Sequence, residues 1–167
     1  MLLGALRRAH RLGPLEPAAD LQEVARRHSA EMLARATLAH ALPGSGDLPD
    51  RLRRAGVSYR AALENVAKGR TARAAHAVAA ESPAHRANML SPVASRVGVG
   101  IARGRLASGA PVVYLTEIFL QPPEDGDSSP LTPEARVREA LWRERARRRV
   151  PPLLADGRLD ELARQAA

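Results

Sequence analysis

Two apolar runs in the second half of the chain, RVGVGIAR (residues 96–103) and VVYLTEIFL (residues 112–120), have the composition of β-strands. Gly104, Gly109 and Pro111 lie in the segment between them and favour a turn, so we expect an antiparallel hairpin. The segments that precede the hairpin carry helical periodicity. Helices followed by one small sheet bury their apolar faces in stacked layers, and the sequence therefore predicts an α+β sandwich.

The clearest helical pattern begins at Asp20, and we expect this helix to continue to about His40. Asp20 and Glu23 have the spacing of a capping box at its start. The imidazole of His28 is expected on the buried face of the helix. The apolar positions that recur at helical spacing are Leu21, Val24, Ala25, His28 and Met32.

Shorter helices are predicted by their start and stop signals. Asp47 or Asp50 is expected to cap a short basic helix, and Thr71 to cap a helix that Pro83 stops. The polar stretch ESPAHRANML, residues 81–90, is expected to form a turn or a short helix.

Charge and composition narrow the classes of partner. The chain has 167 residues and a formal charge of +8, with 26 Lys and Arg against 18 Asp and Glu, but only 2% of its residues are aromatic. The arginines alternate with glutamates along helical faces, and so few aromatic side chains cannot form a platform for bases, so a nucleic acid is not the expected partner. The chain has no cysteine, which rules out disulfides and thiolate metal sites.

Neither a membrane span nor a signal peptide is expected. No stretch approaches the roughly 20 apolar residues of a transmembrane helix. The start, MLLGALRRAHRLG, holds a shorter apolar run than the roughly 7–15 residues of a secretory signal. Either the protein stays inside the cell or its signal is not part of this sequence.

The C-terminal segment of the chain resembles the N-terminal segment in sequence. Residues 121–130, QPPEDGDSSP, have the composition of a linker between a domain at residues 1–120 and a helical appendage at residues 131–167. Within the appendage, residues of the N-terminal segment recur in one register: Pro14, Leu15, Leu21, Glu23, Ala25 and Arg26 match Pro152, Leu153, Leu159, Glu161, Ala163 and Arg164. The alternative is that two unrelated helices share Leu, Ala and Arg through composition.

The apolar positions of this appendage are Val137, Leu141, Leu159 and Leu162. If residues 131–167 form an amphipathic helix pair, this face must be buried. It would be covered either by its own domain or by a second copy in a homo-oligomer.

Four segments in a fixed order carry a family resemblance: LQEVARRHSAEMLARATLAH, DLPDRLRRAGVSYRAALENVAKG, ESPAHRANMLSPVASRVGVGIAR and VVYLTEIF. Together they resemble the bacterial branch of the CAP superfamily, which also holds cysteine-rich secretory proteins, antigen 5 allergens and pathogenesis-related proteins. The resemblance covers residues from about 2 to 120. It implies a three-layer α-β-α sandwich with a small antiparallel sheet, and an extracellular or cell-envelope location.

The same resemblance implies a cleft lined by histidines and acids. Carried over position by position, His40, Glu64 and His85 match the first histidine, the first glutamate and the second histidine of the family's tetrad. Ser82 stands where eukaryotic members have the second glutamate. The neighbouring Glu81 would point about 100° away around a helix. Ala79 replaces a large aromatic residue that is common in the family, which predicts a looser floor of the cleft.

The side-chain chemistry of His40, Glu64 and His85 is compatible with two interpretations. Two imidazoles and a carboxylate suffice to hold a divalent metal such as zinc, with a fourth position for water or ligand, and such a site could support hydrolysis. In the other interpretation His85 bonds to the backbone, Glu64 pairs with an arginine and His40 merely closes a helix. We expect Arg86 and Asn88 to support the cleft by hydrogen bonds, since both side chains offer several donors.

Other catalytic templates are absent from the sequence. No serine lies in a G-x-S-x-G motif, no phosphate-binding GxxxxGK[ST] occurs, and VGVGIARG is interpreted as a strand. His10 and His76 are expected on the surface.

We therefore expect a binding module rather than an enzyme. It would bind a small ligand, a divalent cation or a surface partner in the cleft of His40, Glu64 and His85. The alternatives are a metal-assisted hydrolase of peptide or ester bonds, with Glu64 or Glu81 as ligand or base, and an assembly module acting through residues 131–167.

Overall fold

A computed structural model of the chain describes residues 2–123. The predictions for residues 131–167, and most of the predicted linker, lie outside these described residues. In chain order the elements are α1 (Leu2–Ala9), β1 (Glu16–Pro17), α2 (Ala19–Ala34), α3 (Leu48–Arg54), β2 (Ala61–Gly69), α4 (Ala72–Glu81), α5 (Pro83–Met89), β3 (Arg96–Arg105) and β4 (Pro111–Gln121). None of the helices in this part of the chain is long and apolar enough to cross a membrane.

The sheet contains the predicted hairpin at its centre. Its strand order is β1-β3-β4-β2, with β3 and β4 antiparallel as predicted and β2 antiparallel to β4. The two-residue β1 pairs with β3 in parallel, so the sheet is mixed. Strand β2, which the sequence left without an assignment, forms one edge of the sheet.

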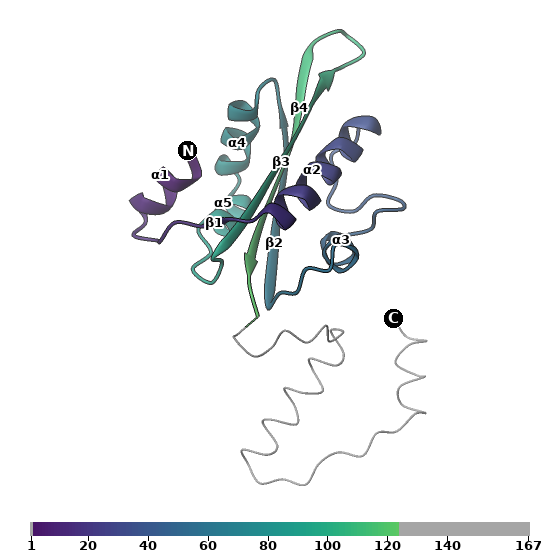
Figure 1. Cartoon of the computed structure of the whole chain (residues 1–167). Coiled ribbons are helices and arrows are strands. Elements are labelled where there is room, and N and C mark those ends of the chain that lie inside the picture. The colour runs from purple at the N-terminus through teal and green to yellow at the C-terminus, as the bar shows by residue number, and fades with distance from the viewer. Residues whose placement is uncertain (1, 124–167) are drawn as a thin grey trace, which may run out of the picture. The chain divides into compact units, whose positions relative to one another are not determined.

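Helices cover both faces of this sheet, which confirms the predicted α+β sandwich (Figure 1). Helices α2 and α3 lie on one face, and α1, α4 and α5 lie on the other (Figure 1). Glycines explain how closely α2 approaches β3: a Cβ atom added to Gly98 or Gly100 would lie 2.3 Å or 2.1 Å from a backbone atom of α2. The prediction of VGVGIARG as a strand is confirmed, with the glycines serving helix-to-sheet contact.

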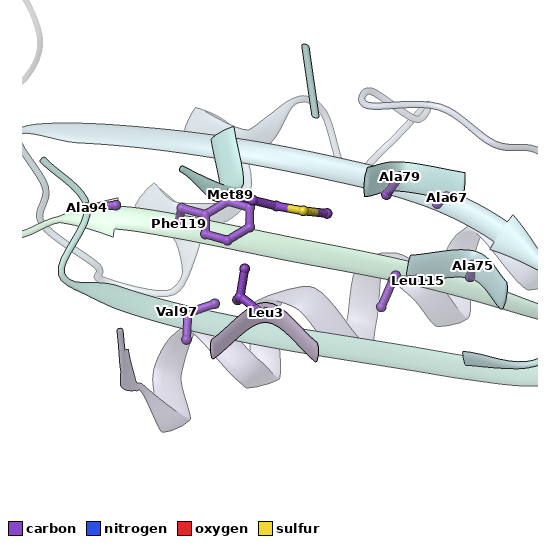
Figure 2. Packing of buried hydrophobic residues seen from close by; sticks show 9 residues of the cluster. All are labelled: Leu3, Ala67, Ala75, Ala79, Met89, Ala94, Val97, Leu115 and Phe119. Atoms are coloured by element: carbon purple, nitrogen blue, oxygen red, sulfur yellow. The ribbon is translucent and has the colours of Figure 1, made fainter. Parts of the chain in front are cut away.

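The two faces have separate apolar clusters because successive side chains of a strand point to opposite sides. On the α4 face, Phe119 and Leu115 of β4 pack with Ala75 and Ala79 of α4 and with Leu3 of α1 (Figure 2). On the α2 face, Ile118 and Leu120 of the same strand pack with residues of α2 and α3. The small alanines of α4 allow it to lie close to β2.

The predicted caps of the short helices are confirmed. Asp47 accepts a hydrogen bond from the backbone N–H of Asp50 at the start of α3, and Thr71 does the same for Ala74 at the start of α4. The stretch at residues 81–90 forms a short helix, α5, which begins at Pro83. Ser82 is therefore the junction at which one helix ends and the next begins.

Two predictions for α2 were wrong. The helix ends at Ala34, because Ala36 adopts a left-handed conformation (φ 50°) and the N–H groups of Ala36 and Thr37 bond back to the carbonyls of Leu33 and Met32. The capping box does not form either, since the N-cap residue is Ala18, whose N–H bonds to the carbonyl of Val97. His40 therefore lies in the loop after α2.

Candidate functional site

The edge strand β2 brings two polar side chains to opposite faces of the sheet. Glu64 has the same orientation as Val66, which packs on the α2 face, whereas Asn65 has that of Ala67, which packs on the α4 face. Glu64 is 8% exposed and Asn65 is 1% exposed. Buried polar groups require hydrogen-bond partners, and each of the two residues has its own set.

The carboxylate of Glu64 is bound by two partners. Its Oε1 lies 2.9 Å from Nδ1 of His40, and its Oε2 accepts a hydrogen bond from the guanidinium of Arg51. Arg51 also donates from Nη1 to the carbonyls of His40 (2.8 Å) and Gly46 (2.9 Å). Arg51 is thus a buried clamp that fixes both the carboxylate and the loop that carries His40. The sequence interpretation in which Glu64 pairs with an arginine describes one half of this arrangement.

Hydrogen bonding and charge make His40 a better base than a free imidazole. The hydrogen bond to Glu64 raises the pKa of His40, while partial burial opposes this shift. The side chain of His40 is nevertheless 56% exposed. Because Nδ1 faces Glu64, Nε2 is the ring atom left to meet a ligand.

His85 lies near His40 but belongs to the helical layer on the α4 face of the sheet. It lies on α5, half-buried, with its ring centroid 6.4 Å from that of His40 and the two ring planes at 60°. Its backbone carbonyl accepts a hydrogen bond of 3.1 Å from the side chain of Asn65. The two imidazoles therefore meet beside the free edge of β2, one from each face of the sheet.

The remaining predicted residues differ in their distance from this pair. Asn88 donates from Nδ2 to the backbone carbonyl of Glu64 (3.2 Å) and to Oδ1 of Asn65 (2.9 Å), which ties α5 to β2. Arg86 instead contacts the exposed His10, with 3.2 Å between Nη2 and Nε2. Glu81 is exposed at the end of α4, and no contact with the imidazole pair is seen for it or for Ser82 among residues 2–123.

The predicted surface position of His76 was wrong. Its side chain is only 14% exposed, and its Nδ1 lies 2.7 Å from Oε1 of Glu117. Glu117 is 2% exposed and also accepts a hydrogen bond from Asn65 (3.1 Å). The contact with Glu117 raises the pKa of His76. A carboxylate buried in the sheet needs such partners, which is why this histidine turns inward.

Sequence reasoning missed three buried polar residues of this network: Arg51, Asn65 and Glu117. Glu117 was detectable in principle, since it interrupts the apolar run of β4 with a charge. Asn65 stands opposite Glu117 in the register of β2 and β4, a relation that only the pairing of the strands reveals. Arg51 carried no signal among 26 basic residues.

A zinc ion bound by His40, Glu64 and His85 does not fit this arrangement. Both carboxylate oxygens of Glu64 already have partners, and the Arg51 guanidinium beside them disfavours a cation. Within residues 2–123, no group of three or more His, Cys, Asp or Glu side chains is arranged to hold a metal ion. The arrangement therefore favours hydrogen bonding over metal ligation for this carboxylate.

Comparison with known proteins identifies a family match and several solved structures with a similar fold. The family described as the cysteine-rich secretory protein family (CAP) matches residues 2–119. No curated protein matches the chain. An extracellular protein of Bacillus anthracis that contains an SCP domain is 29% identical, with a TM-score of 0.62 over 72% of this chain and 38% of its own.

Two further structures share the fold at lower identity. An outer surface protein of Borrelia burgdorferi is 19% identical, with a TM-score of 0.62 over 73% of this chain and 88% of its own. A cysteine-rich secretory protein of Staphylococcus aureus is 18% identical, with a TM-score of 0.52 over 72% of this chain and 36% of its own. The chain thus spans little more than a third of the Bacillus and Staphylococcus proteins.

Proposed function

The chain belongs to the cysteine-rich secretory protein (CAP) family, and we propose that it is a binding module whose imidazole pair, His40 and His85, holds a small oxygen-bearing ligand. The observation that carries the proposal is the double engagement of Glu64 by His40 and Arg51. A carboxylate held in this way orients an imidazole but is poorly placed to act as a metal ligand or a general base.

The chemistry of the pair suggests the class of ligand. His40 keeps its proton more firmly than a free histidine, so its exposed Nε2 is suited to donate a hydrogen bond to an acceptor. A carboxylate, phosphate or carbonyl oxygen between the two rings would meet this donor. The second ring, on α5, adds a contact whose position depends on the bond from Asn65 to the carbonyl of His85.

A location outside the cell is part of the same proposal. Its support is the description of similar proteins as extracellular in Bacillus anthracis and as an outer surface protein in Borrelia burgdorferi. A module of this kind would meet its ligand in the medium or in the cell envelope.

A titration followed by NMR of the histidine side chains tests the proposal. Acetate and inorganic phosphate serve as simple oxyanion probes, first with the wild type and then with His40→Gln and His85→Ala. We expect the resonances of both imidazoles to shift with one dissociation constant, and binding to weaken about tenfold or more in each variant, as for the loss of a charge-assisted hydrogen bond. Binding that is indifferent to both substitutions would exclude the cleft.

Calorimetric titration with zinc decides between this function and the metal-assisted alternative. His10→Ala is the matched control, because it removes an exposed histidine that lies outside the imidazole pair. The metal-assisted alternative predicts that zinc binds stoichiometrically to the wild type and to His10→Ala but not to His40→Gln or His85→Ala. This result would contradict our proposal and support a metal-assisted hydrolase. Zinc binding that tracks the total number of histidines would leave the oxyanion proposal in place.

A further inference from the structure

A cavity lies on the α2 face of the sheet, between α2 and α3. It has a volume of about 530 Å³, within the range of small-molecule sites. His28, Ser45 and Arg51 contribute to its walls, together with residues of both helices. Neither His40 nor His85 is among the lining residues, so this cavity is distinct from the imidazole pair beside β2.

Three buried polar atoms that lack a hydrogen-bond partner all belong to residues that line this cavity. Within residues 2–123 the unpartnered buried side-chain atoms are His28 Nδ1, Ser45 Oγ and Arg51 Nε. His28 is 1% exposed and Arg51 is 7% exposed. An unpaired buried polar atom costs roughly 1–3 kcal/mol, so three such atoms on residues that line one cavity indicate a hydrogen-bonding partner that enters it.

The three atoms require a ligand group that both donates and accepts hydrogen bonds. Nε2 of His28 lies 2.9 Å from the carbonyl of Ala39, so Nε2 carries the proton and Nδ1 is left as an acceptor. Burial lowers the pKa of His28, which keeps the ring neutral. Nε of Arg51 is a donor, and Oγ of Ser45 can act either way. Hydroxyl groups, which both donate and accept, match the requirement of each atom.

The charged groups around the cavity already have partners within the protein. Its charged lining residues are Asp20, Glu23, Arg27, Glu31, Arg51 and Arg54. Each acid has an arginine partner: Arg96 for Asp20, Arg26 and Arg27 for Glu23, and Arg35 for Glu31. Arg51 pairs with Glu64, and Arg54 donates to the backbone carbonyls of Gly44, Ser45 and Asp50. A ligand therefore need not bring a charge.

We propose that the cavity between α2 and α3 binds a small uncharged polyhydroxyl compound, a sugar or a polyol, through His28, Ser45 and Arg51. These polar atoms belong to lining residues but are shielded from solvent, so a ligand hydroxyl meets Oγ of Ser45 after a rotation of that side chain, while Arg51 keeps its bonds to Glu64 and to the loop carbonyls. The site goes beyond the oxyanion cleft, yet Arg51 is common to both.

Amide NMR of the uniformly ¹⁵N-labelled full chain tests this proposal, with D-glucose and myo-inositol as neutral probes and inorganic phosphate as the charged one. We expect the neutral probes to shift the resonances of residues 24–31 and 45–55 in a saturable way. Ser45→Ala should weaken the binding by about threefold to tenfold, the effect of one hydrogen bond. Ala55→Trp, which places a large ring at the cavity, should abolish it.

Matched variants separate this site from the cleft and from general damage to the fold. Ala77→Trp adds the same ring to an exposed alanine of α4, in the opposite layer, and should leave sugar binding unchanged. His85→Ala should impair the oxyanion cleft while sugar binding persists, so the two proposals fail independently.

Three results would overturn the inference. The first is the absence of saturable shifts with either neutral probe, which would assign the three polar atoms to bound water. The second is sugar binding that survives Ala55→Trp. The third is a preference for phosphate over both neutral probes at residues 24–31 and 45–55.

Discussion

Two histidine–carboxylate pairs lie on opposite faces of the same sheet, and they differ in what surrounds them. His40 and Glu64, on the α2 face, share their carboxylate with Arg51, and more than half of the His40 side chain is exposed. His76 and Glu117, on the α4 face, share theirs with the amide of Asn65, and His76 is 14% exposed. The same pair chemistry is therefore exposed to solvent on one face and enclosed in a structural network on the other.

Asn65 joins the two regions. Its amide donates to Glu117 and to the carbonyl of His85, and its Oδ1 accepts from Asn88. The buried pair on the α4 face thus helps to position the helix that carries His85 beside His40. The comparison teaches that the exposed pair depends on a buried polar network, and substitutions can separate the two.

The largest effect is expected from Glu64→Ala. The substitution leaves the guanidinium of Arg51 buried without its carboxylate, and breaking a buried ion pair from one side costs about 3–5 kcal/mol. Urea denaturation monitored by circular dichroism measures the loss. The double variant Arg51→Met/Glu64→Leu is the control, because removing both charges should recover most of the stability. A double variant as unstable as Glu64→Ala would show that the ion pair is not the cause.

A smaller loss is expected from Glu117→Leu on the other face. Leucine removes the acceptor of two donors, His76 and Asn65, neither of which carries a permanent charge, and it leaves no unpaired buried arginine. We expect a decrease of about 1–3 kcal/mol in the free energy of unfolding, the cost of unsatisfied buried polar groups. A loss larger than that of Glu64→Ala, measured in the same urea series, would reverse the ranking of the two faces.

The sequence predicted the parts of the fold that depend on local signals. The hairpin of β3 and β4 followed from apolar runs and turn residues, and the caps at Asp47 and Thr71 followed from side-chain chemistry. Strand β2 escaped prediction because AALENVAKG contains helix formers and charges, and it is a strand because it pairs with β4 along its whole length. Tertiary pairing overrode the local preference.

For the site, sequence reasoning supplied three residues, and the structure brings two of them, His40 and Glu64, into direct contact, with His85 beside them. Their partners could not be identified in the same way. Arg51 is one arginine of many in the sequence, and the inward turn of His76 depends on a carboxylate from a strand 41 positions away. Burial and pairing across the sheet, which no local pattern encodes, decide both.

A still smaller loss of stability is expected at Asn88, which links the two regions. Asn88→Ala removes a side chain that donates to Glu64 and Asn65, whereas Arg86→Ala removes one whose contact is the exposed His10. We expect a loss of about 1 kcal/mol for Asn88→Ala and a change within about 0.5 kcal/mol for Arg86→Ala. The two variants are matched, because the residues are neighbours on one short helix. Equal losses in thermal unfolding would contradict a positioning role for Asn88.

The smallest and most specific effect concerns pH. The pKa values of His40 and His76 are both raised, chiefly by hydrogen bonds to Glu64 and Glu117. A group whose pKa is raised on folding contributes its full stability below the unfolded pKa and loses it as the pH rises through the folded value. We therefore expect the free energy of unfolding to fall as the pH rises from about 6.5, the ordinary pKa of histidine.

The two pairs should contribute unequally to this slope. Solvent screens the exposed His40, so His76→Gln should flatten the pH dependence above about 6.5 more than His40→Gln does. His28 acts in the opposite sense, because burial lowers its pKa and its contribution is lost as the pH falls. Urea denaturation at a series of pH values, with the histidine resonances followed by NMR, separates these terms. If His76→Gln leaves the slope unchanged while His40→Gln removes it, then the exposed pair, and not the buried one, couples protonation to folding.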